Sequence, residues 1–228
     1  MTRVLYAEDE AELRSAVTAL FEKFGFEVDA FASCDELLAE FVVSACDLVV
    51  LDIAMPGTNG LGALRRIREV SQVPVIMLTA MDSPQDEVLG LMDGSDDYLT
   101  KPFSPSVLIA RAKALLRRAE VARGANCQGD IAYGNIVLSD KGRRVRVGGA
   151  DLSVTPTEAA LLAFLLRRAE KSVAKEELLR EIWGYREVVE TRATEIAARR
   201  LRNKLIDAGS NVAIQTIWGY GYKATLVS

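Results

Sequence analysis

Hydrophobic and polar residues follow two different patterns along this chain of 228 residues, and the change falls near its middle. In residues 1–118, short apolar runs alternate with segments that have helical spacing. The expected strands are residues 4–7, 26–28, 48–52, 75–79 and 97–100. The first expected helix follows the first strand and ends at Phe24, and the other four span residues 34–43, 61–70, 85–92 and 104–118. Strands that alternate with helices predict an α/β domain with a doubly wound parallel sheet of five strands.

The second half begins after residues 119–127, which lack sustained apolar spacing and are expected to be a linker. Four short strand-like runs come first, at residues 130–133, 136–138, 144–147 and 151–154. Three helices follow, beginning near Thr155, Ala174 and Thr191, and a hairpin at residues 213–224 ends the chain. This order predicts a winged helix-turn-helix domain of the α+β class at residues 128–228.

Composition excludes several kinds of chemistry. The chain has no histidine, which excludes imidazole acid–base catalysis and histidine-ligated metals, and its three cysteines lack metal or redox spacing. Neither a signal peptide nor a membrane-spanning apolar run is visible, so we expect a cytoplasmic protein that does not bind membranes. Residues 1–118 carry a net charge of −8 and residues 119–228 one of +4, which favours a cation site in the first half and an anionic polymer for the second.

Polar side chains follow the predicted strands of the first half where each strand ends. Glu8 and Asp9 follow the first strand, Asp52 ends the third, Thr79 ends the fourth and Lys101 follows the fifth. Because the carboxyl ends of parallel strands meet at one edge of a sheet, we expect these groups to lie together. Three carboxylates favour Mg²⁺, and with it one aspartate can attack a phosphoryl group whose oxygens the lysine and threonine bind. An ion-pair cluster without a ligand is the alternative.

These motifs resemble the receiver domain of two-component response regulators. The stretches that carry the resemblance are Glu8-Asp9, Asp52 with Met55-Pro56 and Gly60, Thr79-Ala80 and Lys101-Pro102-Phe103. The resemblance implies a flavodoxin-like fold in which Asp52 is the phosphoacceptor. It implies that Asp9, Asp52 and the carbonyl of Ala54 bind Mg²⁺, with Glu8 acting mainly through water. It further implies a phosphate-binding and switch set, namely Thr79, Ala80, Tyr98 and Lys101. For Tyr98, a partly buried strand aromatic is an equally good interpretation.

The last predicted helix has one apolar face and one basic face. Thr194, Ala198, Leu201 and Leu205 recur at helical spacing and are expected to point inward. The expected outward residues are Arg192, Ile196, Arg199, Arg200 and Asn203, and Arg202 adds a further cation. Arginines in a winged helix can pair with phosphates or guanine, and asparagine with adenine. A solvated basic face is the alternative.

Residues 128–228 resemble the winged-helix effector domain of the OmpR/PhoB class. The matching stretches are residues 152–158, 178–184, 200–205 and 216–222. This chain has Glu195 and Ala197 where the recognition helix of the class usually has an Asp-x-His pair, and Trp218 where the wing often has arginine. Ile196 and Ala197 are therefore candidates for contacts with thymine methyl groups, and Trp218 for packing on a sugar-phosphate strand.

In this class, active receivers pair through the fourth helix, fifth strand and fifth helix. The positions of one intermolecular ion pair of the class align with Leu89 and Val107. The remaining charges expected at that face are Asp96, Asp97, Arg111 and Arg118. Because an exposed ion pair contributes only about 0–1 kcal/mol, an apolar contact can replace it. We therefore expect a homodimer with a mixed apolar and ionic face that forms partly without phosphate. Packing of Leu89 and Val107 within one subunit is the alternative.

The two resemblances together predict a phosphorylation-switched transcriptional regulator. A sensor histidine kinase would donate phosphate to Asp52, and the dimer would then bind double-stranded promoter DNA. Its only chemistry would be phosphoryl transfer and autodephosphorylation at Asp52, because a phosphatase with an aspartate nucleophile would want a second acid where this chain has Ala54. A regulator that binds DNA without phosphorylation is the other alternative. The resemblance also implies that the segment from Tyr185 to Val189 contacts RNA polymerase, because the class uses the corresponding loop for that contact.

Overall fold

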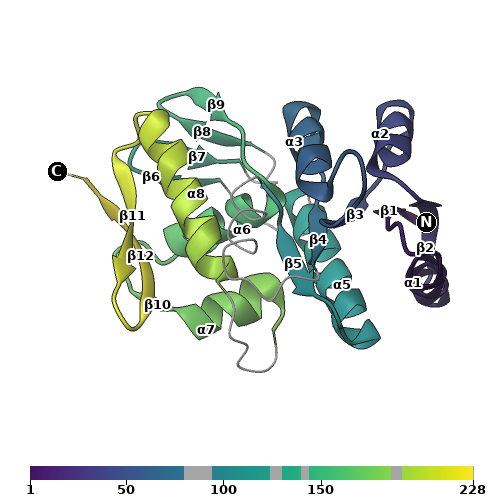
Figure 1. Cartoon of the computed structure of the whole chain (residues 1–228). Coiled ribbons are helices and arrows are strands. Elements are labelled where there is room, and N and C mark those ends of the chain that lie inside the picture. The colour runs from purple at the N-terminus through teal and green to yellow at the C-terminus, as the bar shows by residue number, and fades with distance from the viewer. Residues whose placement is uncertain (80–93, 124–129, 140–143, 186–191, 228) are drawn as a thin grey trace. The chain divides into compact units, whose positions relative to one another are not determined.

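The computed structural model describes residues 1–79, 94–123, 130–139, 144–185 and 192–227, and it divides the chain into two compact units (Figure 1). The first unit comprises residues 1–116 and the second residues 117–228. Each unit has its own hydrophobic core. Within the described ranges, no helix is both long and apolar enough to cross a membrane.

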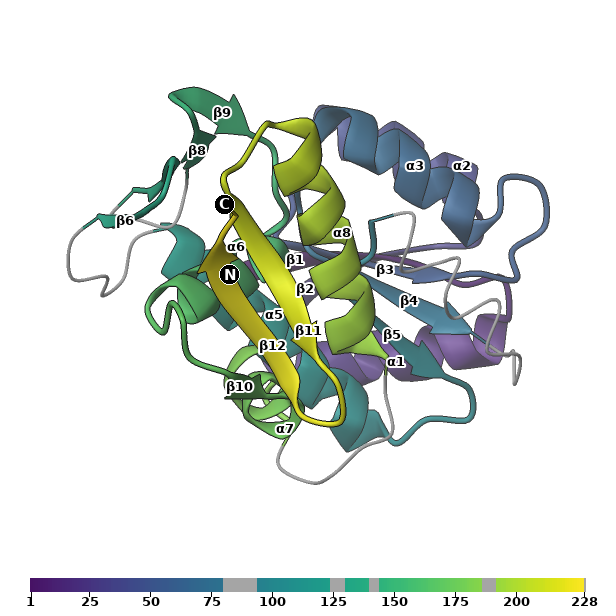
Figure 2. The same ribbon diagram turned by 90° about the vertical axis from the view of Figure 1, so that its left-hand side faces the viewer.

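The first unit is a parallel five-stranded sheet with the order β2-β1-β3-β4-β5. The strands are β1 (Thr2–Ala7), β2 (Phe26–Phe31), β3 (Leu48–Asp52), β4 (Val75–Thr79) and β5 (Asp97–Thr100). The helices are α1 (Ala11–Lys23), α2 (Cys34–Val43), α3 (Gly60–Val70) and α5 (Pro105–Arg123). Helices α2 and α3 cover one face of the sheet, and α1 and α5 the other (Figure 2). The predicted doubly wound sheet is confirmed, while the helix expected at residues 85–92 lies outside the described residues.

Strands β3 and β4 are apolar up to their last residues, Asp52 and Thr79, as expected for strands that are covered by helices on both faces. On the side of α1 and α5, alternate strand residues such as Val50 and Leu78 pack with Phe21 and Leu108. Phe21 of α1 also meets Phe26 of β2 edge to face, with ring centroids 5.4 Å apart. Burial on both faces fixes the strand register, so the strand ends reach the carboxyl edge in a defined order.

The second unit contains two antiparallel sheets. One has the order β6-β7-β8-β9 and the other β10-β12-β11. The strands are β6 (Ile131–Tyr133), β7 (Ile136–Leu138), β8 (Val145–Val147), β9 (Ala150–Leu152), β10 (Val173–Ala174), β11 (Val212–Ile217) and β12 (Gly221–Leu226). The helices are α6 (Pro156–Leu166), α7 (Lys175–Leu178) with the π-helical turn η1 (Leu179–Trp183), and α8 (Ala193–Asp207). The hairpin β11–β12 lies beside α8 (Figure 2), as a winged helix requires.

Local signals in the sequence account for the ends of two helices in the second unit. Thr155 and Glu158 form a capping box at the start of α6, in which each side chain accepts a hydrogen bond from the backbone N–H of the other residue. The segment that contains η1 ends at Gly184, which has a φ of 73°. Glycine adopts this left-handed conformation at little cost, so it ends the helix.

The linker and one strand of the second unit differ from what the sequence predicted. The linker was predicted to begin at residue 119, but α5 continues to Arg123, so residues 119–123 are helical and only 124–127 fall outside the description. Strand β10 was missed because two residues carry no periodic signal, and it pairs with the wing strand β12. The approach is close enough that a Cβ on Gly221 would lie 2.0 Å from the carbonyl oxygen of Val173.

Candidate functional sites

Three acidic residues converge at the carboxyl edge of the parallel sheet. Carboxylate oxygens of Glu8, Asp9 and Asp52 lie within 4.8 Å of one another. Glu8 and Asp52 are buried, with 1% and 3% of their surface exposed, while Asp9 is exposed. Hard oxygen donors at this spacing, with one side open to water, fit a divalent cation such as Mg²⁺. The cluster could therefore bind a metal ion.

Lys101 forms ion pairs with two of these acids. Its Nζ lies 2.7 Å from Oε2 of Glu8 and 2.9 Å from Oδ2 of Asp52. The position of Lys101 follows from the sheet, because its backbone N–H donates to the carbonyl of Thr79 at the end of β4. Burial lowers the pKa of Lys101, but the hydrogen bonds to Glu8 and Asp52 outweigh it, so the pKa is raised and the side chain stays charged. A fixed ammonium between two carboxylates can also bind a phosphoryl oxygen.

Glu8 is the least solvated of the three acids. Burial raises the pKa of its carboxyl group, and the hydrogen bond from Lys101 opposes that rise. The hydroxyl of Tyr6 donates to Glu8 over 3.2 Å, and burial raises the pKa of Tyr6, so the phenol keeps its proton. Glu8 is therefore held by two donors behind Asp52.

The loop after Asp52 folds back against the strand that carries it. The backbone N–H of Ala54 donates to Oδ1 of Asp52 over 3.2 Å, and the N–H of Gly60 donates to the carbonyl of Ile53. A Cβ on Gly60 would lie 2.2 Å from the backbone carbonyl oxygen of Asp52, so only glycine fits. Asn59 then caps α3 through its side chain. One oxygen of Asp52, Oδ1, therefore accepts from the loop, and the other, Oδ2, contacts Lys101.

Thr79 and Tyr98 lie on the neighbouring strands β4 and β5. Both are buried, with 1% and 7% of their surface exposed. Thr79 ends β4, and Tyr98 on β5 pairs with Met77 of β4. Ala80 lies outside the described residues. Thr79 therefore lies at the strand end, where its carbonyl accepts from the backbone N–H of Lys101, and Tyr98 lies two residues before the end of β5.

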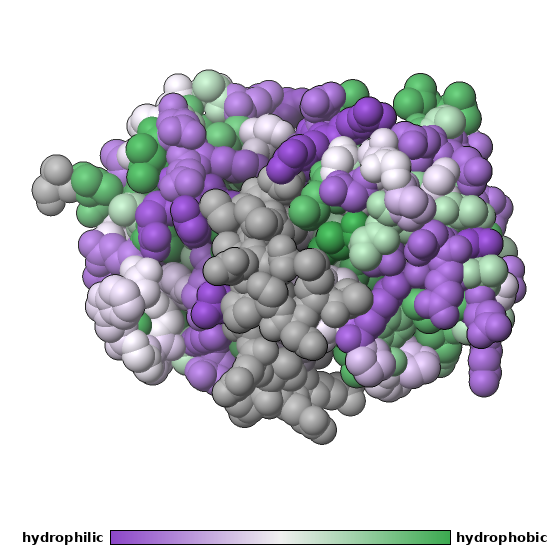
Figure 3. Space-filling model, viewed as in Figure 1, coloured by the Kyte–Doolittle hydropathy of each residue, from purple (hydrophilic) through white to green (hydrophobic). Residues whose placement is uncertain are grey.

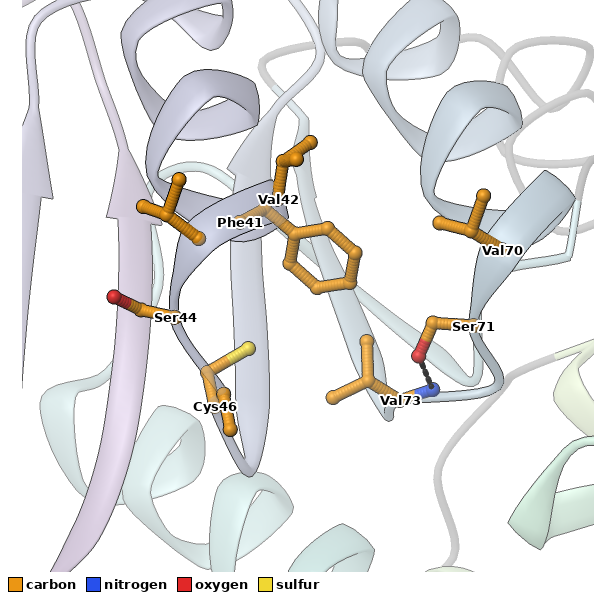
Figure 4. Close-up of a pocket in the computed structure, with 9 residues that line it drawn as sticks. Phe41, Val42, Ser44, Cys46, Val70, Ser71 and Val73 are labelled. Atoms are coloured by element: carbon orange, nitrogen blue, oxygen red, sulfur yellow. Dashed lines mark hydrogen bonds between the residues drawn. The ribbon is translucent and has the colours of Figure 1, made fainter.

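A hollow of about 500 Å³ lies elsewhere in the first unit, between the C-terminal ends of α2 and α3 (Figure 4). It is lined mainly by apolar residues, including Phe41 and Val73, and Ser71 accepts a hydrogen bond from the N–H of Val73 beside it. Val42 and Val43 are 81% and 75% exposed, and hydrophobic side chains gather over α2 in Figure 3. None of its lining residues belongs to the acidic cluster.

The charges expected at a dimer face already have partners in the same chain. Asp96 pairs with Arg68 at 2.8 Å, and Asp97 pairs with Arg111 at 2.9 Å. Both aspartates are buried, and the pairs join β5 and the residue before it to α3 and α5. The expectation that these acids and Arg111 pair across a two-fold axis stays a prediction, and in this structure each of the three has a partner within its own chain.

The other dimer candidates differ in their surroundings. Arg118, at the end of α5, belongs to the second unit, where it donates to the hydroxyl of Thr157 over 3.1 Å and lies 5.6 Å from the ring centroid of Trp183. Val107 is 37% exposed. Leu89 lies outside the described residues.

Helix α8 presents a different face from the one predicted. The exposed residues of α8 and of its N-cap position are Arg192, Glu195, Arg199, Asn203, Ile206 and Asp207. The side chain of Arg200 instead pairs with the buried Glu158 of α6 at 2.8 Å. That of Arg202 donates to the carbonyl of Ile214 and the hydroxyl of Thr216 on β11. The prediction that Arg200 points outward is wrong, and the further cation Arg202 is likewise bound within the unit, because α6 and β11 supply acceptors that the sequence of α8 cannot reveal.

Three further candidates were expected to contact DNA. Ala197 belongs to the core of the second unit, and Ile196 is 6% exposed, so neither methyl-bearing side chain is presented on the surface. Trp218, in the turn of the wing, is 93% exposed. Among the cationic and aromatic residues predicted to contact DNA, Arg192, Arg199 and Trp218 are exposed.

Comparison with known proteins agrees with both halves of this description. Residues 4–113 match the family model of the response regulator receiver domain, and residues 149–224 match that of the C-terminal domain of transcriptional regulatory proteins. The chain thus consists of a receiver domain followed by a DNA-binding effector domain. The chain belongs to the family of response regulators of the OmpR/PhoB type, which act as transcriptional regulators of two-component systems.

Relatives match over nearly the whole chain. The transcriptional regulatory protein ResD of Bacillus subtilis is 36% identical, covering 97% of this chain and 95% of its own length. The sensory transduction protein RegX3 of Mycolicibacterium smegmatis is 37% identical, covering 98% and 99%. Among solved structures, the response regulator DrrB of Thermotoga maritima, an OmpR/PhoB homologue, is 28% identical with complete coverage of both chains and a TM-score of 0.53.

Proposed function

We propose that Asp52 accepts a phosphoryl group from a sensor histidine kinase and that this modification switches DNA binding by the second unit. The observation that carries the proposal is Lys101, whose ammonium joins Asp52 and Glu8 at 2.9 Å and 2.7 Å. An ammonium in this position neutralises charge that would build up on a phosphorylated Asp52. In a regulator that works without phosphorylation, the same two acids and lysine would serve only as a structural ion-pair cluster.

The proposed reaction is a direct transfer. An oxygen of Asp52 attacks phosphorus, the bond from phosphorus to the donor nitrogen of phosphohistidine breaks, and the imidazole leaves with a proton from water. Glu8, Asp9, Asp52 and the carbonyl of Ala54 would hold Mg²⁺, which when bound neutralises the phosphoryl oxygens. Lys101 then exchanges its contact with Asp52 for a phosphoryl oxygen, and Thr79 supplies a hydroxyl to another. The backbone N–H groups that follow Thr79, including that of Ala80, are further candidate donors.

The proposed readout couples the phosphoryl group to DNA. Movement of Thr79 toward the phosphate would leave space for the ring of Tyr98, and the altered surface would favour a homodimer. In the second unit, Arg192 and Arg199 would contact phosphates or guanine, Asn203 adenine or phosphate, and Trp218 a sugar-phosphate strand. The dimer would bind two adjacent half-sites of promoter DNA.

Two further features belong to the same proposal. RNA polymerase is a candidate partner through the segment that begins at Tyr185, most of which lies outside the described residues. Because its target is promoter DNA, we place the protein in the cytoplasm. Apart from phosphoryl transfer to Asp52 and its hydrolysis, no catalytic activity is proposed.

Phosphorylation is tested with acetyl phosphate and Mg²⁺, followed by mass spectrometry of the intact chain. We expect one phosphoryl group on the wild type, and none on Asp52→Asn, because an amide of the same shape is a poor nucleophile. Chelation of Mg²⁺ should slow the reaction, as should Asp9→Asn. Phosphate on the Asp52→Asn variant at the wild-type rate would refute the assignment.

A further inference from the structure

Glu195 is an exposed acidic residue in the first turn of α8. It is the third residue of that helix and lies between Arg192 and Arg199 on the same face, with 45% of its side chain exposed. A carboxylate on a surface that binds a polyanion is electrostatically unfavourable unless something compensates for it. Its presence there requires an explanation other than affinity.

The carboxylate is held in a defined position. Nζ of Lys175 lies 2.8 Å from Oε1 of Glu195, and the hydroxyl of Thr194 donates to Oε2 over 3.3 Å. The backbone N–H of Lys175 donates to the carbonyl of Tyr220 at the tip of the wing. Lys175 thus connects the first turn of α8 with the wing and orients Glu195 at the end of the helix where bases are read in a winged helix-turn-helix.

We propose that Glu195 is a specificity-determining residue that accepts a hydrogen bond from the N4 amine of a cytosine in the major groove. An ionised carboxylate offers acceptors and no donor. Guanine and thymine present acceptor atoms in the major groove, and adenine places the acceptor N7 beside its amine, so the carboxylate favours cytosine. Lys175 compensates the negative charge while Glu195 approaches the DNA. This inference rests on the proposed role of α8 as the helix that reads DNA.

A purely structural role for Glu195 is the competing explanation. An acid in the first turn of a helix interacts favourably with the helix dipole, and the contact with Lys175 steadies the wing. Such a role would change stability or overall affinity, but it would not change which base is preferred at one position. Base identity is therefore the readout that separates the two explanations.

The test is selection of a randomised duplex library by the full chain, phosphorylated with acetyl phosphate and Mg²⁺, for the wild type, Glu195→Ala and Glu195→Gln. We expect one position of the selected site to be cytosine for the wild type, with a discrimination of roughly five- to 150-fold against other bases. Glu195→Ala should remove that preference. Glu195→Gln, which keeps the side-chain shape, should move it toward adenine, because glutamine can bind N6 and N7 together.

Controls distinguish failure of this inference from failure of the DNA-binding assignment. Asp151→Asn removes a comparable exposed acid, paired with Arg146 at 3.1 Å on β8 and β9, and should leave every base preference unchanged. Arg199→Ala should weaken binding if α8 faces the DNA. If Arg199→Ala weakens binding but both Glu195 variants select the wild-type sequence, the inference about Glu195 is wrong. If none of the α8 variants changes binding, α8 is not the reading helix and both proposals fall.

Discussion

Arg200 of α8 forms an ion pair with Glu158 of α6, with 2.8 Å between Nη2 and Oε1. Lys204, one turn further along α8, contacts the other oxygen of Glu158 at 2.7 Å. Glu158 has 1% of its surface exposed and also completes the capping box of α6. One buried carboxylate therefore fixes both the start of α6 and the rotation of α8, which decides which arginines reach the surface.

Removal of Arg200 should destabilise the second unit rather than remove a DNA contact. In Arg200→Ala, the buried carboxylate of Glu158 keeps Lys204 but loses its other ion pair. The loss should lower the free energy of unfolding by about 1–3 kcal/mol, less than for a buried pair left with no partner. Urea unfolding measures this, and the exposed Arg199→Ala should stay within about 0.5 kcal/mol of the wild type. Equal stability of the two variants would show that the Glu158 pair contributes nothing.

Loss of Arg199 should lower DNA affinity and leave stability unchanged, in contrast to loss of Arg200. Because Arg199 is exposed on the outer face of α8, Arg199→Ala should weaken DNA binding while leaving the fold intact. If Arg199 contacts a phosphate, affinity should fall on all sequences. The slope of the logarithm of affinity against the logarithm of salt concentration should then fall in magnitude by about one. The matched control is Arg180→Ala, an exposed arginine of η1 that pairs with Glu181. A larger loss of DNA affinity in the control than in Arg199→Ala would place the interface elsewhere.

Gly60 is expected to be irreplaceable for the phosphoryl site. An alanine Cβ there would lie 2.2 Å from the backbone oxygen of Asp52, so the loop must move and Asp52 with it. Gly60→Ala should therefore reduce both thermal stability and phosphorylation by acetyl phosphate. Gly62→Ala is the control, because its Cβ would meet only side-chain atoms at 3.4 Å. If Gly60→Ala is phosphorylated at the same rate as Gly62→Ala, the loop does not position Asp52.

Glu170 should make the stability of the second unit depend on pH in the acidic range. Hydrogen bonds from Tyr133, then Thr225, lower the pKa of its carboxyl group to about 2, from an ordinary value of 4.5. A lowered pKa in the folded state stabilises the protein above the unfolded-state pKa. This contribution is lost as pH falls from 4.5 through about 2. Thermal unfolding of the wild type and Glu170→Gln should therefore differ most near neutral pH and converge in acid. A difference that stays constant down to pH 2 would contradict this.

The dimer proposed for the phosphorylated form is now expected to rely more on apolar contacts. Asp97 and Arg111 are paired within the chain, so fewer charges are available across a two-fold axis. Sedimentation equilibrium with a phosphoryl mimic should show a dimer that persists at high salt, and Val107→Asp should weaken it. A phosphorylated dimer that dissociates in high salt would show that ion pairs dominate.

The sequence was sufficient to predict features that depend on local pattern or on a general property of parallel sheets. Glu8, Asp52 and Lys101 could be brought together because the carboxyl ends of parallel strands meet at one edge. The outward face of α8 could not be predicted fully, because Arg200 is turned inward by Glu158, 42 positions earlier. Strand β10 was missed because two residues show no period, and only pairing with β12 defines it.

The most direct test of the account measures DNA affinity with and without acetyl phosphate in the presence of Mg²⁺, for the wild type and Asp52→Asn. The duplex is one selected by the phosphorylated wild type, and salt is held constant because phosphate contacts make affinity depend on it. We expect the wild type to bind more tightly when the phosphodonor is present, and Asp52→Asn to bind equally weakly under both conditions. Equal affinity of the wild type with and without the donor, at full phosphorylation of Asp52, would contradict the proposal that phosphorylation switches DNA binding.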